Sequence, residues 1–409
     1  MRRRAILVAA VALAGGLIWA QQLAAQRVTV TVSLGASEVH DGWYRLYEEQ
    51  HPNVKIESFV VPGASMEDFL RARAAAGTLP DLFAINSNAF GHKFMADGFA
   101  ADLADTAAAA NTLPGLREPF TTPAGQVYGI PVGTATTWMY YNRDLIAEAG
   151  IAAIPTTWDE FIAALEKLKS NRIAGTIIDK DGFGNTWFSY IFAQKVVPGE
   201  PDFVAKIERG EFDFTQAGVA DIFTKVKYLT DNGLAHKAFL STNNAQASSL
   251  FLQGRAATYF AGSWQASQLL DGDVDAGIFF PAVKDVGEAT MGVLVPETGA
   301  GINAASENLD AALALLDWMF GEGYAFYQNG MGNIPSVVEV MGEVKLDPRV
   351  IRVLDEVKGY PQTRLWFQYL PSETLPLVNK LLDEVLLGDL TPQEAAQELH
   401  NAARDAVMQ

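Results

Sequence analysis

The chain has 409 residues, 49% of them hydrophobic and 11% aromatic, so it is longer than one ordinary domain and can fill two hydrophobic cores. Its formal charge of -18 at pH 7 argues against nucleic acid or an anionic membrane as a partner, and it disfavours anionic ligands outside a local basic pocket. The absence of cysteine excludes both a disulfide and a lipid-modified cysteine as a membrane anchor.

Residues 1–25 have the three parts of a secretory signal peptide. Arg2-Arg3-Arg4 precedes an apolar run over residues 5–20, and small residues follow at Ala24 and Ala25. We therefore expect cleavage after Ala25 and a free, soluble protein in the periplasm, with a formal charge of -21 because three arginines are removed. An uncleaved anchor is the alternative, although the apolar run is short for a membrane span.

Strands and helices alternate in the first part of the chain. Residues 28–32 alternate between valine and threonine as a strand does, and residues 54–60 and 82–85 are typical of two further strands. Two helices separate these strands, and the second is opened by a capping box of Ser65 and Asp68. Strands that alternate with helices predict a parallel sheet.

Ligands of parallel sheets lie beyond the carboxyl ends of the strands. This rule nominates Glu38 in the loop after the first strand, and Asn86 and Asn88 after the third. We expect these three side chains to contact a ligand.

The segment from Tyr128 to Phe161 predicts the first passage of the chain between two lobes. Pro131 interrupts an apolar run, and the short aromatic strand from Trp138 to Tyr141 then begins a second sheet. Thr134, beside this passage, is a further candidate ligand contact. Thr157 and Glu160 form the capping box of the helix that follows.

The rest of the chain predicts two more passages between lobes. A strand over residues 256–260 ends at Gly262-Ser263-Trp264, and a strand that ends at Pro281 places the second passage there. The third passage is expected between Met331 and Pro335. The last helix begins at Thr391-Pro392-Gln393-Glu394, an N-cap, a proline and a capping glutamate.

Several of these segments together resemble the solute-binding proteins of ATP-binding-cassette importers, in the group with the maltose and multiple-sugar receptors (extracellular solute-binding protein family 1). They occur in that family's order and cover nearly all of the mature chain: Gly77 to Leu82, Tyr128 to Gly133, Trp138 to Leu145, Thr156 to Phe161, Phe251 to Ala257, Gly262 to Trp264, Ala300 to Ser306 and Gly388 to Glu394.

The resemblance implies an α/β fold of the periplasmic-binding-protein type. Two α/β lobes, each with a central sheet, would be joined by a hinge of several strands, with the ligand cleft between them. With the passages predicted above, residues 26–132 and 282–335 form the first lobe, and residues 133–281 and 336–409 form the second.

The function that the resemblance implies is capture of a small sugar, oligosaccharide or polyol by lobe closure, and its delivery to the permease subunits of an importer. We expect a monomer that is not an enzyme and needs no cofactor. Two alternatives stay open: a periplasmic carbohydrate-active enzyme with two cleft carboxylates, and a receptor of the same fold for an anion or ferric iron, for which Tyr140, Tyr141 and Tyr190 are available.

Aromatic side chains are the strongest candidates for sugar contacts, because an indole can cover the apolar face of a sugar ring. Trp264 follows a glycine and a serine at a strand end, which favours a cleft position over the core. Trp187, Trp366 and Tyr369 are further candidates, each with core packing as the alternative. The five histidines have no metal-ligand spacing, so neither a metal site nor a catalytic residue is predicted.

Overall fold

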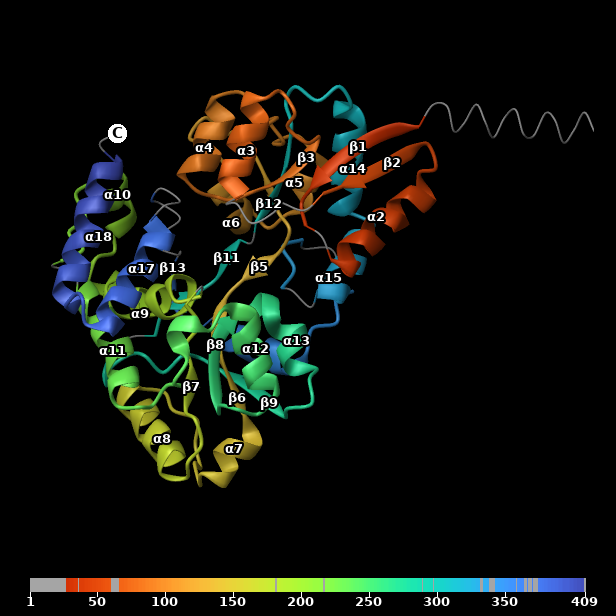
Figure 1. Ribbon diagram of the computed structural model, residues 1–409. Helices are drawn as coiled ribbons and strands as arrows, with labels where there is room; N and C mark the ends of the chain where they lie inside the picture. The colour runs from red at the N-terminus through yellow and green to blue at the C-terminus, as the bar shows by residue number, and fades with distance from the viewer. Residues whose placement is uncertain are drawn as a thin grey trace, which may run out of the picture.

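The computed structural model shows two α/β lobes joined by extended segments (Figure 1). It describes residues 27–407, apart from residues 36, 60–65, 181, 216–217, 289, 297, 332–333, 338–342, 358, 364–365, 367–369 and 371–373. The predicted signal peptide over residues 1–25 and the candidate Tyr369 lie outside the described residues. None of the helices in the described part of the chain combines the length and apolar character that a membrane crossing requires.

The first lobe is built on a five-stranded sheet in the order β2-β1-β3-β12-β4. Strand β1 is parallel to β2 and β3, whereas β12 is antiparallel to β3 and β4. The bounds are β1 (Val28–Ser33), β2 (Val54–Ser58), β3 (Leu82–Ile85), β4 (Ile130–Pro131) and β12 (Gly299–Ile302). The predicted parallel order of the first three strands is confirmed.

Helices cover both faces of this sheet because its strands are apolar on both sides. Leu82 of β3 packs in one core cluster with α2, α14 and α15, whereas Phe83 and Ile85 pack in another with α3 and α4. The helices of the first lobe are α2 (Glu38–Gln50), α3 (Met66–Ala75), α4 (Ala89–Ala96), α5 (Ala107–Asn111), α6 (Pro114–Arg117), α14 (Leu309–Met319) and α15 (Tyr324–Met331).

The second lobe is built on a four-stranded sheet in the order β7-β8-β6-β9. Strand β7 is parallel to β8, and β6 is antiparallel to both β8 and β9. Alternate residues of β6 face opposite sides, so Met139 joins one core cluster while Trp138 and Tyr140 join another. The bounds are β6 (Thr137–Asn142), β7 (Thr176–Ile177), β8 (Thr258–Gly262) and β9 (Ala276–Phe279).

The helices of the second lobe come from two separate parts of the chain. They are α7 (Arg143–Glu148), α8 (Trp158–Ser170), α9 (Ser189–Lys195), α10 (Phe203–Glu208), α11 (Val219–Asp231), α12 (Asn244–Leu252), α13 (Ala266–Leu270), α16 (Pro348–Val357), α17 (Thr374–Leu387) and α18 (Pro392–Val407). One short helical turn, η1 (Glu118–Phe120), lies in the first lobe. The others lie in the second lobe: η2 (Gly184–Phe188), η3 (Val197–Gly199), η4 (Phe239–Ser241) and η5 (Ser263–Gln265).

Two predicted capping boxes are confirmed at the starts of α8 and α18. The Thr157 hydroxyl accepts a hydrogen bond from the backbone N–H of Glu160, whose carboxylate accepts one from the Thr157 backbone in return. Thr391 and Glu394 form the same reciprocal pair. These caps satisfy backbone donors that the first helical turn leaves without partners.

Two short strands form the ribbon that joins the lobes. Strand β5 (Thr134–Ala135) pairs antiparallel with β11 (Val295–Pro296), and both run between the two sheets (Figure 1). The chain therefore first leaves the first sheet after Pro131. A further pair, β10 (Gly292–Val293) with β13 (Gln362–Thr363), lies in the second lobe. Strand β10 directly precedes β11 along the chain.

The second and third passages lie later in the chain than predicted. Ala282, Val283 and Val293 still pack in a core cluster of the second lobe, so the chain returns at β11 and not at Pro281. Val337 packs in the core of the first lobe, so the third passage is completed beyond the predicted Pro335. Pro281 follows the end of β9, but the chain stays in the second lobe after it.

Candidate ligand-binding site

The carboxyl ends of β3 and β8 both lie beside the hinge ribbon. Ile85, the last residue of β3, pairs with Gly299, which lies three residues after the end of β11 at Pro296. At the other lobe, the backbone N–H of Ser263 donates to the carbonyl of Thr136, the residue after β5. The loops after the two strands therefore both lie beside the hinge ribbon, and the carboxyl ends of strands are where open α/β sheets bind ligands.

Trp264 lies on the short turn η5 directly after β8, and 41% of its surface is exposed. Its indole lies over Gly262, where an added Cβ would come within 2.3 Å of three ring carbons. Only a glycine allows this approach. The backbone thus supports part of the ring while a large apolar surface stays open, as in a platform for a flat ligand.

A chain of hydrogen-bonded polar side chains begins at Gln265, the residue after Trp264. Gln265 donates from its amide to Asn244, Asn244 donates to the Tyr259 hydroxyl over 3.1 Å, and Tyr259 donates to the Asp179 carboxylate, also over 3.1 Å. Burial raises the pKa of Tyr259, and the negative charge of Asp179 raises it further, so the phenol stays a neutral donor. Asp179 also accepts a hydrogen bond from the Gly182 backbone.

The Oε1 atom of Gln265 gives this polar chain a spare acceptor. The atom is buried and has no hydrogen-bond partner among the described residues. A buried acceptor without a partner costs free energy, so this atom would gain stability from any donor that reached it.

In the first lobe the predicted polar residues have different surroundings. Asn86 accepts a long hydrogen bond of 3.3 Å from the Thr298 hydroxyl, beside the hinge ribbon. Asn88 caps α4 by accepting from the Gly91 backbone, and it donates to Glu67 over 2.7 Å. Asn86 thus keeps more capacity for a ligand than Asn88, whose side chain already holds a helix start.

The two remaining polar candidates are Glu38, at the start of α2, and Thr134, in the hinge strand β5. Glu38 is exposed at the first turn of α2, directly after the N-cap Ser37. Thr134 is buried within β5, where its backbone N–H donates to Ile334 over 2.7 Å and its hydroxyl donates weakly to Pro335. Thr134 therefore binds together two hinge segments.

Two of the predicted aromatic contacts are wrong because both rings lie in the core of the second lobe. Trp187 is 1% exposed and packs against Phe260 and Phe161. Trp366 is fully buried, and its indole N–H donates to Ser189 over 3.0 Å. Neither ring presents a face to solvent, so neither forms a wall for a ligand.

Sequence reasoning missed Asp179, Asn244, Tyr259 and Gln265. The rule for strand ends would have found Asp179, which lies two residues after β7, but a two-residue strand has no readable alternation. Asn244 is the first residue of α12, a position that helix capping alone explains. Within the described residues, no three His, Asp or Glu side chains lie together as a metal site would require.

Comparison with known proteins gives a consistent result. Residues 20–326 match the sequence profile of the family described as bacterial extracellular solute-binding protein. The melibiose/raffinose/stachyose-binding protein MelE of Bacillus subtilis is 29% identical over 180 residues, which is 43% of this chain and 41% of that relative. The galactooligosaccharide-binding protein of the same organism is 20% identical over 384 residues, 88% of this chain and 85% of that protein.

Solved structures share the fold. A chitin oligosaccharide binding protein has a TM-score of 0.81 at 22% identity, covering 94% of this chain and all of the other. The solute-binding protein RafE in complex with raffinose has a TM-score of 0.79 at 20% identity, covering 93% of this chain and all of the other.

Proposed function

Because the chain belongs to the bacterial extracellular solute-binding protein family, we propose that it binds a small sugar, oligosaccharide or polyol and delivers it to the permease of an ATP-binding-cassette importer. Relatives named for melibiose, raffinose, stachyose and galactooligosaccharides support a carbohydrate ligand. The signal-like residues 1–25 support secretion to the periplasm as a soluble protein.

The observation that carries this proposal is the exposed indole of Trp264 at the hinge. A sugar ring has an apolar C–H face, which the indole covers, and a rim of hydroxyls, which need donors and acceptors. The spare acceptor on Gln265 lies next along the chain from the indole, and Asn86 faces the hinge from the other lobe. These neutral amides suit an uncharged ligand.

Lobe closure is the proposed mechanism. A ligand that contacts Trp264 on one lobe and Asn86 on the other binds the closed state more tightly than the open one, so it shifts the equilibrium towards closure. The β5–β11 ribbon and the segment from Ile334 to Val337 would act as the hinge. A hinge of several strands permits rotation but prevents independent tumbling of the lobes.

The alternatives from the sequence receive less support. A glycosidase needs two carboxylates facing one bond, but Asp179 is 3% exposed and is engaged by Tyr259 and Gly182. Ferric iron needs phenolate ligands, but burial raises the pKa of both Tyr140 and Tyr190 and so disfavours ionisation. The named relatives are likewise binding proteins.

Calorimetric titration with a panel of raffinose, melibiose, galactooligosaccharides, chitin oligosaccharides and polyols tests the proposal. We expect saturable binding of at least one of them, with no new product in the mixture. The Gly262→Ala variant should bind more weakly, because the added methyl group displaces the indole of Trp264. Absence of binding across the panel, or turnover of a glycoside, would contradict the proposal.

A further inference from the structure

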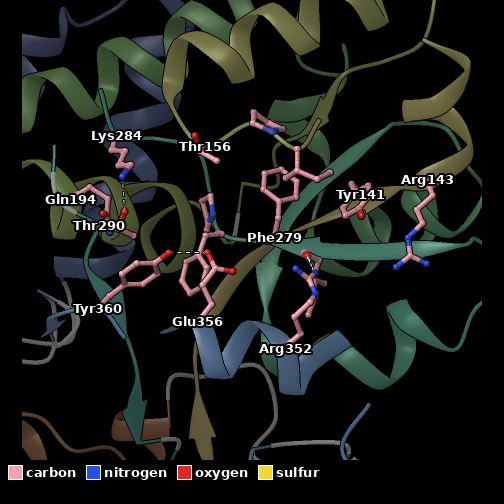
Figure 2. A pocket seen from close by; sticks show the side chains of 15 residues that line it. Tyr141, Arg143, Thr156, Gln194, Phe279, Lys284, Thr290, Arg352, Glu356 and Tyr360 are labelled. Carbon is pink, nitrogen blue, oxygen red and sulfur yellow. Dashed lines mark hydrogen bonds between the residues drawn. The ribbon is translucent and has the colours of Figure 1, made fainter. Parts of the chain in front are cut away.

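A pocket of about 640 Å³ lies in the second lobe, and none of its lining residues belongs to the candidate sugar site. It lies over the edge strand β9, between the loop before α8, the segment that follows β9, and helix α16 (Figure 2). This volume is in the range of pockets that enclose small organic ligands. Nothing in the proposed sugar transport uses it.

The charge of the pocket is opposite to that of the chain. Three cations line it, Arg143, Lys284 and Arg352, against the single carboxylate of Glu356, although the whole chain has 48 acidic and 30 basic residues. Arg143 is paired with Asp275 at 2.7 Å. The excess positive charge therefore resides on Lys284 and Arg352.

Neither of these two cations has a carboxylate within ion-pair distance among the described residues. Lys284 donates to the Thr290 hydroxyl over 2.6 Å and to the Glu288 carbonyl over 3.3 Å, and Arg352 donates to the carbonyl of Ile278 over 2.7 Å. These neutral oxygens hold the side chains in place without cancelling their charge. Figure 2 shows the two cations on different walls of the pocket.

The other walls are apolar, aromatic and already ordered. Phe280 and Tyr360 lie edge to face, with ring centres 5.4 Å apart, and Tyr141 adds a third ring. The Tyr360 hydroxyl donates to the Glu356 carboxylate over 2.8 Å, and this hydrogen bond holds the two side chains together. Gln194 is held by two hydrogen bonds to the Met291 backbone. A ligand would find these groups already in position, which lowers the entropy cost of binding.

From this arrangement we propose that the pocket is a second binding site, for an organic carboxylate with a flat, apolar or aromatic body. The carboxylate pairs with Lys284 or Arg352 through charge-assisted hydrogen bonds, and the body packs against the aromatic walls. A hydroxyl on the far end would donate to Glu356. This site is independent of the sugar site, since it shares no residue with it.

The test is calorimetric titration of the full mature chain with 4-hydroxybenzoate, and with the neutral 4-hydroxybenzamide as the matched ligand. We expect the carboxylate to bind about tenfold or more tightly than the amide, and Lys284→Gln to weaken it by about tenfold or more. Lys284→Gln is the decisive variant, because glutamine can still hydrogen-bond Thr290. Arg352→Gln should act in the same direction if it keeps its fold, as circular dichroism would show.

Two control variants make the outcome specific. Lys380→Gln removes an exposed cation on α17, which does not line the pocket, and Trp264→Ala removes the candidate sugar platform, so both should bind 4-hydroxybenzoate as the parent does. Equal binding of the amide, unchanged binding by Lys284→Gln, or no binding of the carboxylate at about 10 mM would overturn the proposal. Failure here would leave sugar binding at the hinge unaffected, so the two proposals fail separately.

Discussion

Two tryptophans of this chain, Trp264 and Trp187, have different surroundings. Trp264 and Trp187 both follow short polar segments, but one is 41% exposed and the other 1% exposed. The exposed ring rests on Gly262, whereas the buried one is enclosed by aromatic neighbours. Their substitutions should therefore separate ligand binding from stability.

Trp264→Ala should weaken sugar binding by about 2 to 4 kcal/mol, which is about thirty- to a thousandfold in affinity. The expected reason is loss of a large, rigid surface that covers the sugar face. Because the ring is partly exposed, the unfolding free energy should change little. Calorimetry and chemical unfolding on the same preparation measure the two effects, and Trp264→Phe should retain much of the affinity.

The matched control is Trp187→Ala. It should lower the unfolding free energy by about 3 to 5 kcal/mol, as expected for an aromatic side chain removed from a core. If the Trp264 variant instead lost stability to the same extent and bound sugar normally, its indole would be part of the core and not of the site.

A buried histidine makes stability depend on pH. His40 is 7% exposed, its Nδ1 atom lies 2.8 Å from the Ser37 hydroxyl, and burial lowers its pKa more than Asp41 raises it. The unfolded chain therefore binds a proton near the ordinary pKa of 6.5, whereas the folded protein binds it only at lower pH. The unfolding free energy should fall as pH falls below 6.5.

Chemical unfolding at pH 7.5 and pH 5.5 checks this dependence. Burial also lowers the pKa of His236, so both histidines contribute to the fall. His40→Gln removes one contribution, and its stability should fall less between the two conditions than that of the parent. An identical fall in both proteins would show that His40 titrates normally in the folded state.

At the scale of helices and strands, local signals predicted the starts and ends that local contacts determine. The strand over residues 82–85 and the caps at Thr157 and Thr391 are as predicted. Helix α11 ends at Asp231, with Asn232 as its C-cap before Gly233, whose φ is +61°. These features depend on side chains within a few residues of each other, so the sequence contains the necessary information.

Several of the elements that the sequence did not predict are two-residue strands. Strands β5, β7 and β11 have no alternation to read, and each exists because a distant segment pairs with it. The return of the chain at β11 and the polar chain around Asp179 depend on such pairs, so their positions could not be predicted. The burial of Trp187 and Trp366 likewise depends on side chains from distant segments, such as Phe260 and Ser189.

The capping box of α8 gives a prediction for a single element. Thr157→Ala should lower the unfolding free energy by about 1 kcal/mol, because the backbone N–H of Glu160 loses its acceptor. Ser170→Ala at the other end of the same helix is the control. The exposed Ser170 hydroxyl donates to the Glu166 carbonyl and takes no part in the N-terminal cap. This variant should change the unfolding free energy by less than about 0.5 kcal/mol. Equal effects of both variants would rule out a special contribution of the cap.

At the scale of the whole molecule, function depends on three passages of the chain between the lobes. The β5–β11 ribbon and the segment beyond Ile334 are bound together at Thr134, so we expect the lobes to rotate as units. The strand ends that carry Trp264 and Asn86 lie beside this ribbon. A sugar bound there would be enclosed by a small rotation and released by its reversal.

Small-angle scattering with and without a saturating sugar from the panel tests whether ligand binding closes the lobes. We predict that the radius of gyration decreases while the far-ultraviolet circular dichroism spectrum stays the same, because rigid lobes rotate without refolding. Trp264→Ala at the same sugar concentration should show little or no decrease. Calorimetry shows which sugar concentration is saturating. If the radius of gyration of the parent protein did not change at that concentration, ligand-induced closure of the lobes would be contradicted.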